Sequence, residues 1–399
     1  MNDATSVSAP STDIDIYSEE HLLNPFDNYR RLRDLGPLVW FPQYELYGVY
    51  RYADVKPYLR DHETFISGAG IGVNDMVNGI MGGQVVIASD PPLHTTLRKN
   101  FDDALRPRYL RDVIGDINAR ADAIVEGILE RGEIDGMLDF ARGLPVDIVM
   151  DLIGFPRDEN RKKIYTWASN SFNALGPESQ ERTIEGFHHQ VDMLRYGDEG
   201  LLPENLLPGS FGQVAYAAVE RGDMEYSYYV THMLGLLNAG LDTTTNAVGS
   251  ALWLLATHAD QWEILRSDPD RVAPMLFLEA VRLESPAQIM TRVAARPAEI
   301  GSTAVPEGAR IVHSYGSANR DERHYADPDR FDILRNPVDT LAFDFGIHTC
   351  PGRSLSQMES DAMFRALARR ATKLELTGEP TREANNVTRG FKTLPIRVS

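Results

Sequence analysis

Cysteine is almost absent from this sequence of 399 residues, in which Cys350 is the single example. One thiol excludes an internal disulfide, a cysteine-rich zinc site and an iron-sulfur cluster, because each of these needs several cysteines. Long apolar runs are also missing, since charged or strongly polar residues interrupt every stretch of about 18 residues, the length that a membrane span requires. We therefore expect a cytoplasmic protein without a membrane anchor.

A secretory signal and an excess of positive charge are lacking as well. The first 20 residues are polar and acidic, without the cationic start and apolar run of a signal peptide, and we expect residues 1–20 to form a loose tail. Aspartate and glutamate total 58 residues against 40 lysines and arginines, which gives a net charge of −18. Since binding to phosphates needs clustered cations, this balance argues against nucleic acid and anionic membranes as partners.

What the sequence does contain is mostly helical periodicity. Apolar residues recur at intervals of three and four over residues 110–130, 226–258, 274–283 and 355–371, as is typical of helices that bury one face. Short β segments lie towards the two ends of the chain, in GPLVWFP, ELYGVYRY, residues 292–316 and TKLELTG. The pattern predicts an α+β fold that is mainly helical, and because no linker divides the chain, we expect one domain over residues 21–399.

The segment 225–259 predicts one helix that is on the order of 50 Å long, enough to cross the whole molecule. Its centre, NAGLDTTTN, places Gly240, an acid and three threonines among apolar residues. A glycine inside a helix costs about 1 kcal/mol, and threonine hydroxyls compete for backbone carbonyls. Such a weakened centre indicates either a functional site or a helix bend that packs against a neighbour.

The single cysteine lies in a loop, FDFGIHTCPG, whose composition suits a buried thiolate. Cysteine binds iron as the thiolate, and a buried thiolate needs hydrogen-bond donors or a positive partner. Gly346 and Gly352 let the chain fold closely around the sulfur of Cys350, while Phe343 and Phe345 exclude water. The helix that follows the proline would direct the positive end of its dipole at the sulfur.

This loop resembles the heme-binding signature F-G-x-G-x-H-x-C-x-G of cytochrome P450 enzymes, and the chain resembles their soluble bacterial heme-thiolate monooxygenases. The matching residues are Phe343, Gly346, His348, Cys350 and Gly352. Asp344 stands where the family usually has its first glycine, so we expect a backbone adjustment and an extra carboxylate near the heme. The resemblance extends from NPFDNYRRLRDLGP to RGFKTLPI, and it implies the P450 fold, with a long central helix over the heme and small β-sheets.

The cofactor implied by the resemblance is heme b, iron protoporphyrin IX, held without covalent links apart from the bond between iron and the Cys350 thiolate. The C-x-x-C-H motif of covalent heme attachment does not occur in the sequence. His94 and Arg98, four residues apart in DPPLHTTLR, match the helix that contacts one porphyrin propionate, and Arg292 and His348 would hold the other. The expected cofactor contacts are His94, Arg98, Arg292, Phe343, His348, Cys350 and Gly352.

Glu279 and Arg282 form an E-x-x-R pair on one face of a helix. Alone, such a pair is usually a solvated ion pair worth about 0.3 kcal/mol. Its position ahead of Cys350 matches the family, and the resemblance implies that the pair locks to an arginine of DPDRFDILR. The sequence leaves Arg330 and Arg335 open as that partner.

Asp242 and Thr243, in AGLDTT, match the acid and alcohol pair with which the family activates dioxygen. The resemblance implies that Thr243 hydrogen-bonds the bound oxygen and that Asp242 supplies protons through water, while Ala239 and Gly240 make room above the iron. This pair favours an O2-dependent monooxygenase over the alternative class, a non-catalytic heme-thiolate binding or sensor protein.

Electrons are expected from an external protein, because the chain ends soon after the heme loop and leaves no length for a flavin or ferredoxin domain. The expected donor is a ferredoxin that is reduced by a flavin-dependent NAD(P)H reductase. By resemblance, a basic run on the thiolate side of the heme is the hypothesised docking surface, with a solvated helix end as the alternative. The run comprises Arg98, Lys99, Arg106, Arg108 and Arg111. The protein is expected to be a monomer.

The substrate pocket of the family falls, by resemblance, on residues 67–76, 171–176, 288–290 and 390–393 and on the inner face of the long helix. These positions are mostly apolar and small, which suits a compact, hydrophobic and aromatic substrate better than a macrolide or a long fatty acid, and equally suits an ordinary core. The expected substrate contacts are Phe172, Leu175, Leu234, Asn238, Ala239, Ile289, Met290 and Phe391.

Three short stretches, FNALGP, LLNAGLDTT and YGSANRD, resemble bacterial enzymes that O-demethylate or hydroxylate para-substituted benzoates. Those enzymes hold the substrate carboxylate with arginine and hydroxyl groups, whereas residues 67–76 contain no cation and Leu234 and Gly235 offer no side-chain donor. A carboxylate buried without donors is strongly disfavoured. We therefore expect hydroxylation or O-demethylation of a neutral phenol, methoxyarene or similar small hydrophobe, with terpenoid hydroxylation as the alternative.

Overall fold

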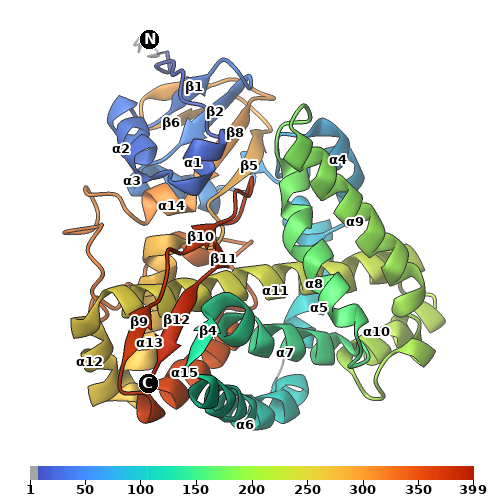
Figure 1. Ribbon diagram of the computed structural model, residues 1–399. Coiled ribbons are helices and arrows are strands. Elements are labelled where there is room, and N and C mark those ends of the chain that lie inside the picture. Colours follow the sequence, from blue (N-terminus) through green and yellow to red (C-terminus); the bar gives the residue numbers. More distant parts are fainter. Residues whose placement is uncertain (1–7, 106) are drawn as a thin grey trace.

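A long helix, α11 (Tyr226–Thr257), crosses the middle of the molecule, with the large N-terminal sheet on one side and α6, α7 and α15 on the other (Figure 1). The computed structural model describes residues 8–105 and 107–399. Helices predominate and the β-sheets are small, which confirms the α+β class expected from the sequence. Among the described residues, no helix combines the length and the apolar composition that crossing a lipid bilayer requires.

The regular elements follow one another along the whole described chain. The α-helices are α1 Glu19–Leu23, α2 Phe26–Leu35, α3 Tyr52–Arg60, α4 Asp75–Met81, α5 Leu93–Ala104, α6 Pro107–Arg131, α7 Gly143–Ile153, α8 Asn160–Ser171, α9 Glu181–Gly200, α10 Phe211–Glu220, α11 Tyr226–Thr257, α12 Ala259–Ser267, α13 Pro269–Glu284, α14 Tyr315–Ala318 and α15 Arg353–Arg370. The short 3-10 and π helices are η1 Val86–Ala88, η2 Gly136–Ala141, η3 Phe172–Leu175, η4 Pro203–Asn205 and η5 Leu341–Phe343. The strands are β1 Val39–Phe41, β2 Leu46–Val49, β3 Phe65–Ile66, β4 Glu133–Asp135, β5 Ile289–Ala294, β6 Ala298–Ile300, β7 Thr303–Val305, β8 Arg310–Ser314, β9 Leu374–Leu376, β10 Thr381–Arg382, β11 Phe391–Thr393 and β12 Pro395–Val398.

The N-terminal segment packs onto the β-rich part from residue 8 onward. The Trp40 amide donates to the carbonyl of Pro10 at 2.8 Å, and the Thr12 amide donates to the carbonyl of Trp40 at 3.0 Å. Ile16 and Tyr17 are buried in a cluster with residues of α2 and β1. For residues 8–20 this packing differs from the loose tail expected for residues 1–20, because two large apolar side chains complete the core beside α2. Residues 1–7 of the expected tail lie outside the described residues.

The largest sheet has five strands in the order β1-β2-β8-β5-β3, of which β2 and β8 are parallel and the other neighbours antiparallel. The β segments GPLVWFP and ELYGVYRY contain β1 and β2, which pair with each other. In the β5 to β8 register, Met290 lies opposite His313 and Arg292 lies opposite Ile311. Because side chains alternate along a strand, Met290 and Arg292 share one face of the sheet and Ile289 lies on the other.

Helix α11 has 32 residues, so it is about 48 Å long at 1.5 Å per residue. Its weakened centre remains helical. The Thr243 hydroxyl donates to the carbonyl of Ala239 at 2.7 Å, and the Thr245 hydroxyl donates to that of Leu241 at 2.8 Å. At Gly240, a Cβ atom would lie 2.9 Å from a methyl carbon of Val149 on α7. The glycine therefore permits close packing of the two helices.

Candidate functional site

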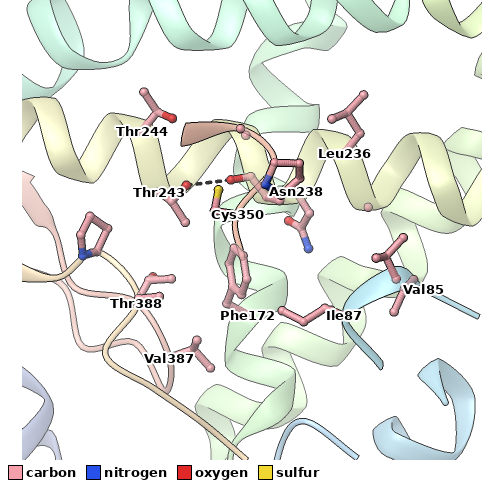
Figure 2. Close-up of a pocket in the computed structure, with 18 of the residues that line it drawn as sticks. Val85, Ile87, Phe172, Leu236, Asn238, Thr243, Thr244, Cys350, Val387 and Thr388 are labelled. Atoms are coloured by element: carbon pink, nitrogen blue, oxygen red, sulfur yellow. Dashed lines mark hydrogen bonds between the residues drawn. The ribbon is translucent and has the colours of Figure 1, made fainter. Parts of the chain in front are cut away.

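A cavity of about 540 Å³ is bordered by α11 and by the loop that carries the single cysteine. Thr243 and Asn238 line it from α11, Cys350 from the loop, and Phe172 from η3. Figure 2 shows these side chains around the pocket, together with Val387 and Thr388 from the chain before β11 and residues near η1. Segments far apart in the sequence therefore meet at one largely apolar space.

The Cys350 thiol lies in the turn that precedes α15. Its backbone amide donates to the carbonyl of Phe343 at 2.8 Å, which closes the loop across seven residues. At Gly346, where φ is +92°, a Cβ atom would lie 3.0 Å from the carbonyl oxygen of Leu59, so the loop packs directly on the end of α3. Burial raises the pKa of the Cys350 thiol, while the Gly352 amide and the charge of Arg98 act to lower it. A metal cation at the sulfur would supply the missing stabilisation of the thiolate.

Two buried imidazoles lie beside this loop with unused hydrogen-bonding capacity. The rings of His94 and His348 meet edge to face, with centroids 4.6 Å apart. Within the described part of the chain, the Nε2 atoms of both rings are buried and have no hydrogen-bond partner. Burial, Arg292, His94 and Arg98 lower the pKa of His348 to about 2, and burial also lowers the pKa of His94. Two neutral imidazoles with free nitrogen atoms suit a ligand that brings its own acceptors, such as the carboxylates of a porphyrin.

The expected cofactor contacts are not all at the cavity wall. Arg98, Phe343, His348, Cys350 and Gly352 line the cavity. His94 and Arg292 are absent from the described residues that line it. The Arg98 guanidinium forms a 2.9 Å ion pair with Asp102 and donates to the carbonyl of Ile347 at 3.3 Å. The donor set of two arginines and two histidines, together with a lone thiol, fits a dianionic porphyrin whose iron is held by sulfur.

The acid and alcohol pair on α11 is divided between two environments. Thr243 lines the cavity, whereas Asp242 is absent from the described lining residues. The Asp242 carboxylate is buried, accepts hydrogen bonds from Ser169 at 2.7 Å and from Asn246 at 2.9 Å, and has no ion pair among the described residues. Burial raises the pKa of Asp242, against the hydrogen bonds from Ser169 and Thr388 that lower it.

The E-x-x-R pair of α13 is buried and has Arg335 as its partner. Arg282 makes two hydrogen bonds with Glu279, at 2.7 and 2.8 Å. The Arg335 guanidinium donates to the same carboxylate at 3.2 Å. Arg330 contributes only its carbonyl oxygen, which accepts from Arg282 at 3.4 Å and from Arg335 at 3.3 Å. The pair thus fixes the chain that leads into the cysteine loop.

Six of the eight expected substrate contacts line the cavity. They are Phe172, Leu175, Leu234, Asn238, Ala239 and Met290. Ile289 and Phe391 are absent from the described residues that line the cavity. Ile289 faces the opposite side of β5 from Met290 and is buried in the N-terminal core cluster. The Phe391 ring packs against Trp253, and the Arg382 guanidinium lies 3.8 Å from its centroid.

Several lining residues have no counterpart in the expected set. They include Ile80, Met81, Val85, Ile87, Pro286, Ala287, Val387 and Thr388. Val387 and Thr388 lie just ahead of the expected segment 390–393, and both of their amides donate to the Asn385 side chain at 3.0 Å. An Asn followed by such a turn is a recognisable local signal, yet only the tertiary fold reveals that the turn faces α11.

The basic run proposed for docking is described only in part. Arg106 lies outside the described residues, as do the side chains of Arg108 and Arg111. Lys99 is exposed. Arg98 lines the cavity, so this arginine is not a free surface cation.

Comparisons with known proteins agree on one family. The family profile described as Cytochrome P450 matches residues 217–391. The chain is 33% identical over 393 residues to Cytochrome p450 CYP199A2 of Rhodopseudomonas palustris, an alignment that covers 98% of this chain and 95% of that protein. It is 28% identical to Linalool 8-monooxygenase of Pseudomonas putida, over 96% of this chain and 97% of the relative.

Solved structures with the same fold are numerous. The structure of P450BioI in complex with an acyl carrier protein that carries hexadec-9Z-enoic acid has a TM-score of 0.85 and 25% identity, with 95% of this chain and 100% of that chain covered. The structure of cytochrome P450 CREJ with (4-ethylphenyl) dihydrogen phosphate has a TM-score of 0.84 and 26% identity, with 95% and 98% covered.

Proposed function

This chain belongs to the cytochrome P450 family and is a heme b monooxygenase, and from this premise we propose that its substrate is a small, neutral, hydrophobic and aromatic molecule. One observation carries the proposal. Among the described residues that line the cavity, the only basic side chains are Arg98 and His348, and both belong to the surroundings of the cysteine loop. The wall formed by α11, η3 and residues 387–388 therefore offers no cation to a substrate carboxylate.

Cys350 is proposed as the iron ligand, because it is the single cysteine of the chain and lines the cavity. Heme b, when bound, supplies the iron centre at which dioxygen is activated, and a thiolate ligand favours cleavage of the O–O bond. Arg98 and His348 are proposed to bind the porphyrin propionates directly, with His94 and Arg292 supporting them. Phe343 and Gly352 shape the space beside the sulfur.

Thr243 is proposed to orient water and hold a proton at its hydroxyl on the cavity side of α11. In the structure this hydroxyl donates to the Ala239 carbonyl at 2.7 Å, so it retains acceptor capacity towards the cavity. Asp242 is proposed to supply protons. Its carboxylate is held by the neutral groups of Ser169 and Asn246. The side chain of Asp242 can therefore rotate without breaking an ion pair, and the rotated carboxyl group can exchange protons with water.

Substrate recognition is proposed to combine apolar walls with one polar pair. Ser171 and Asn238 hydrogen-bond one another at 2.8 Å, and both line the cavity. Their remaining donor and acceptor positions suit a phenol or ether oxygen, while Phe172, Leu175 and Met290 supply apolar contact. The CREJ structure holds a para-substituted aryl ligand, which supports an aromatic substrate. The relative named Linalool 8-monooxygenase supports a terpenoid as the second candidate.

We further propose hydroxylation or O-demethylation as the reaction, with electrons delivered by a ferredoxin and its flavin-dependent reductase. Bacterial members of the family typically use a ferredoxin. The docking surface would lie near α5 and α6, where Lys99 is exposed. Charge reversal at Lys99 should raise the Michaelis constant for ferredoxin at low salt and have no effect at high salt.

The test is a spectral titration of the ferric protein with matched pairs of aromatic compounds. Each pair consists of a neutral methoxyarene or phenol and the analogue that carries a carboxylate in the para position. Displacement of the water on iron changes the heme absorbance, so the titration reports binding without turnover. We expect the neutral member of each pair to bind more tightly by at least about tenfold, or 1.4 kcal/mol. Tighter binding of the benzoates would contradict the proposal.

A further inference from the structure

Asp344 has a backbone conformation that residues other than glycine rarely adopt. It follows η5 and has φ +60° and ψ −176°. This region is almost restricted to glycine, and a side chain placed there is maintained only when its surroundings impose it. Glycine is also the residue that the heme signature usually has at this position. The side chain of Asp344 must therefore make interactions that compensate for an unfavourable backbone.

The carboxylate of Asp344 is held by three groups. The Tyr315 hydroxyl donates to Oδ2 at 2.7 Å, and the Phe345 amide donates to Oδ1. A guanidinium nitrogen of Arg292 lies 3.7 Å from Oδ1. Burial raises the pKa of Asp344, while Arg292 and the two hydrogen bonds lower it. The two hydrogen bonds and the contact with Arg292 are strongest when the carboxyl group is ionised, so they act against the effect of burial.

Arg292 is held in place by the end of α3. Its guanidinium donates to the carbonyl of Leu59 at 2.8 Å and lies over the Tyr58 ring, 5.7 Å from the centroid. Asp344 lines the cavity, and Arg292 is absent from the described residues that line it. The positive charge of Arg292, which supports the propionate-binding residues, is therefore already paired with a carboxylate of the chain.

We propose that Asp344 is a positioning residue that holds Arg292 and places a fixed negative charge at the edge of the heme, so that the heme reduction potential is lower than it would be with glycine. A negative charge in a buried site opposes the addition of an electron to the iron. The inference rests on the proposed function, because it requires a heme bound by the loop of Cys350.

The test is a redox titration of the purified holoprotein and three variants at one pH and one ionic strength. Asp344→Asn keeps the size of the side chain and an acceptor for Tyr315 but removes the charge. Asp344→Gly removes the charge and the backbone conflict together. Tyr315→Phe is the matched control for the hydrogen bond alone, since it removes one donor to Asp344 and keeps the carboxyl group and its contact with Arg292.

The expected result is a higher reduction potential in both Asp344→Asn and Asp344→Gly, and no increase in Tyr315→Phe. Unchanged potentials in both Asp344 variants would overturn the inference. An increase in Asp344→Gly alone would also overturn it, because the cause would then be the backbone rather than the charge. Failure of the unmodified protein to show a thiolate-bound heme would contradict the proposed function instead, and the two failures are therefore distinguishable.

Discussion

Buried carboxylates at the end of α13 and on α11 and α15 have similar burial but opposite surroundings. Glu284, at the end of α13, forms ion pairs with Arg320 at 3.2 Å, Arg382 at 2.8 Å and Arg389 at 3.2 Å. Asp242 on α11 is held by hydroxyl and amide groups, and Glu359 on α15 has a buried oxygen without a partner in the described part of the chain.

The difference is visible in the acidity of these groups. Burial alone raises the pKa of each carboxyl, but the arginines around Glu284 outweigh burial and lower its pKa to about 2. No cation opposes burial at Glu359, whose pKa is raised to about 8. Charge partners, rather than depth, therefore decide which buried acids are fixed as structural anions and which can exchange protons.

The largest expected effect on stability follows from removing the ion-paired carboxylate of Glu284. Glu284→Gln leaves three arginines around a neutral amide, and we expect the free energy of unfolding at pH 7 to fall by about 3–5 kcal/mol. The measurement is denaturant unfolding of the holoprotein, with Glu307→Gln, an exposed site, as the control. Because the pKa of Glu284 is lowered on folding, its contribution is present above the unfolded value near 4.5 and is lost as the pH falls towards 2. Equal free energies of unfolding for Glu284→Gln and Glu307→Gln would contradict the stabilising role of the ion pairs around Glu284.

A smaller change in the free energy of unfolding, of opposite sign, is expected at Glu359, which has no ion pair among the described residues. Since the pKa of Glu359 is raised on folding to about 8, the carboxyl causes no loss of stability below about pH 4.5, and stability declines as the pH rises towards 8. Glu359→Gln should therefore be more stable than the unmodified protein by about 2 kcal/mol at pH 8 and no more stable at pH 4.5. Unfolding curves at the two pH values test this, and a difference independent of pH would contradict it.

The smallest expected change concerns turnover rather than folding. Asp242→Asn keeps the size of the side chain and loses the exchangeable proton, so we expect turnover to fall about tenfold, or about 1.4 kcal/mol in activation free energy. Thr243→Ala should instead divert reducing equivalents to hydrogen peroxide while substrate binding is retained. Peroxide yield and the solvent isotope effect on turnover are the measurements. Full coupling in both variants would show that the pair has no part in proton delivery.

The features predicted correctly from the sequence are those in which the chemistry lies close together along the chain. The loop around Cys350, the Glu279 and Arg282 pair and the long helix all follow from local spacing. The position of Met290 at the cavity was also expected, although its neighbour Ile289 was assigned the same role.

The remaining features depend on the tertiary structure. Strand alternation separates Ile289 from Met290, but the face that each occupies is set by the pairing of β5 with β8. The choice of Arg335 over Arg330 depends on how the chain returns to α13. The inward turn of residues 387–388 and the pairing of Asp344 with Arg292 are equally long-range, so local spacing carries no signal for them.

The central claim, that the Cys350 thiolate holds a heme, is tested most directly by the absorbance of the ferrous carbonyl adduct in the purified protein and in Cys350→Ala. The account predicts the red-shifted Soret band of a thiolate-bound heme in the unmodified protein and its loss in the variant. The same band in Cys350→Ala, or a colourless unmodified protein, would contradict the account.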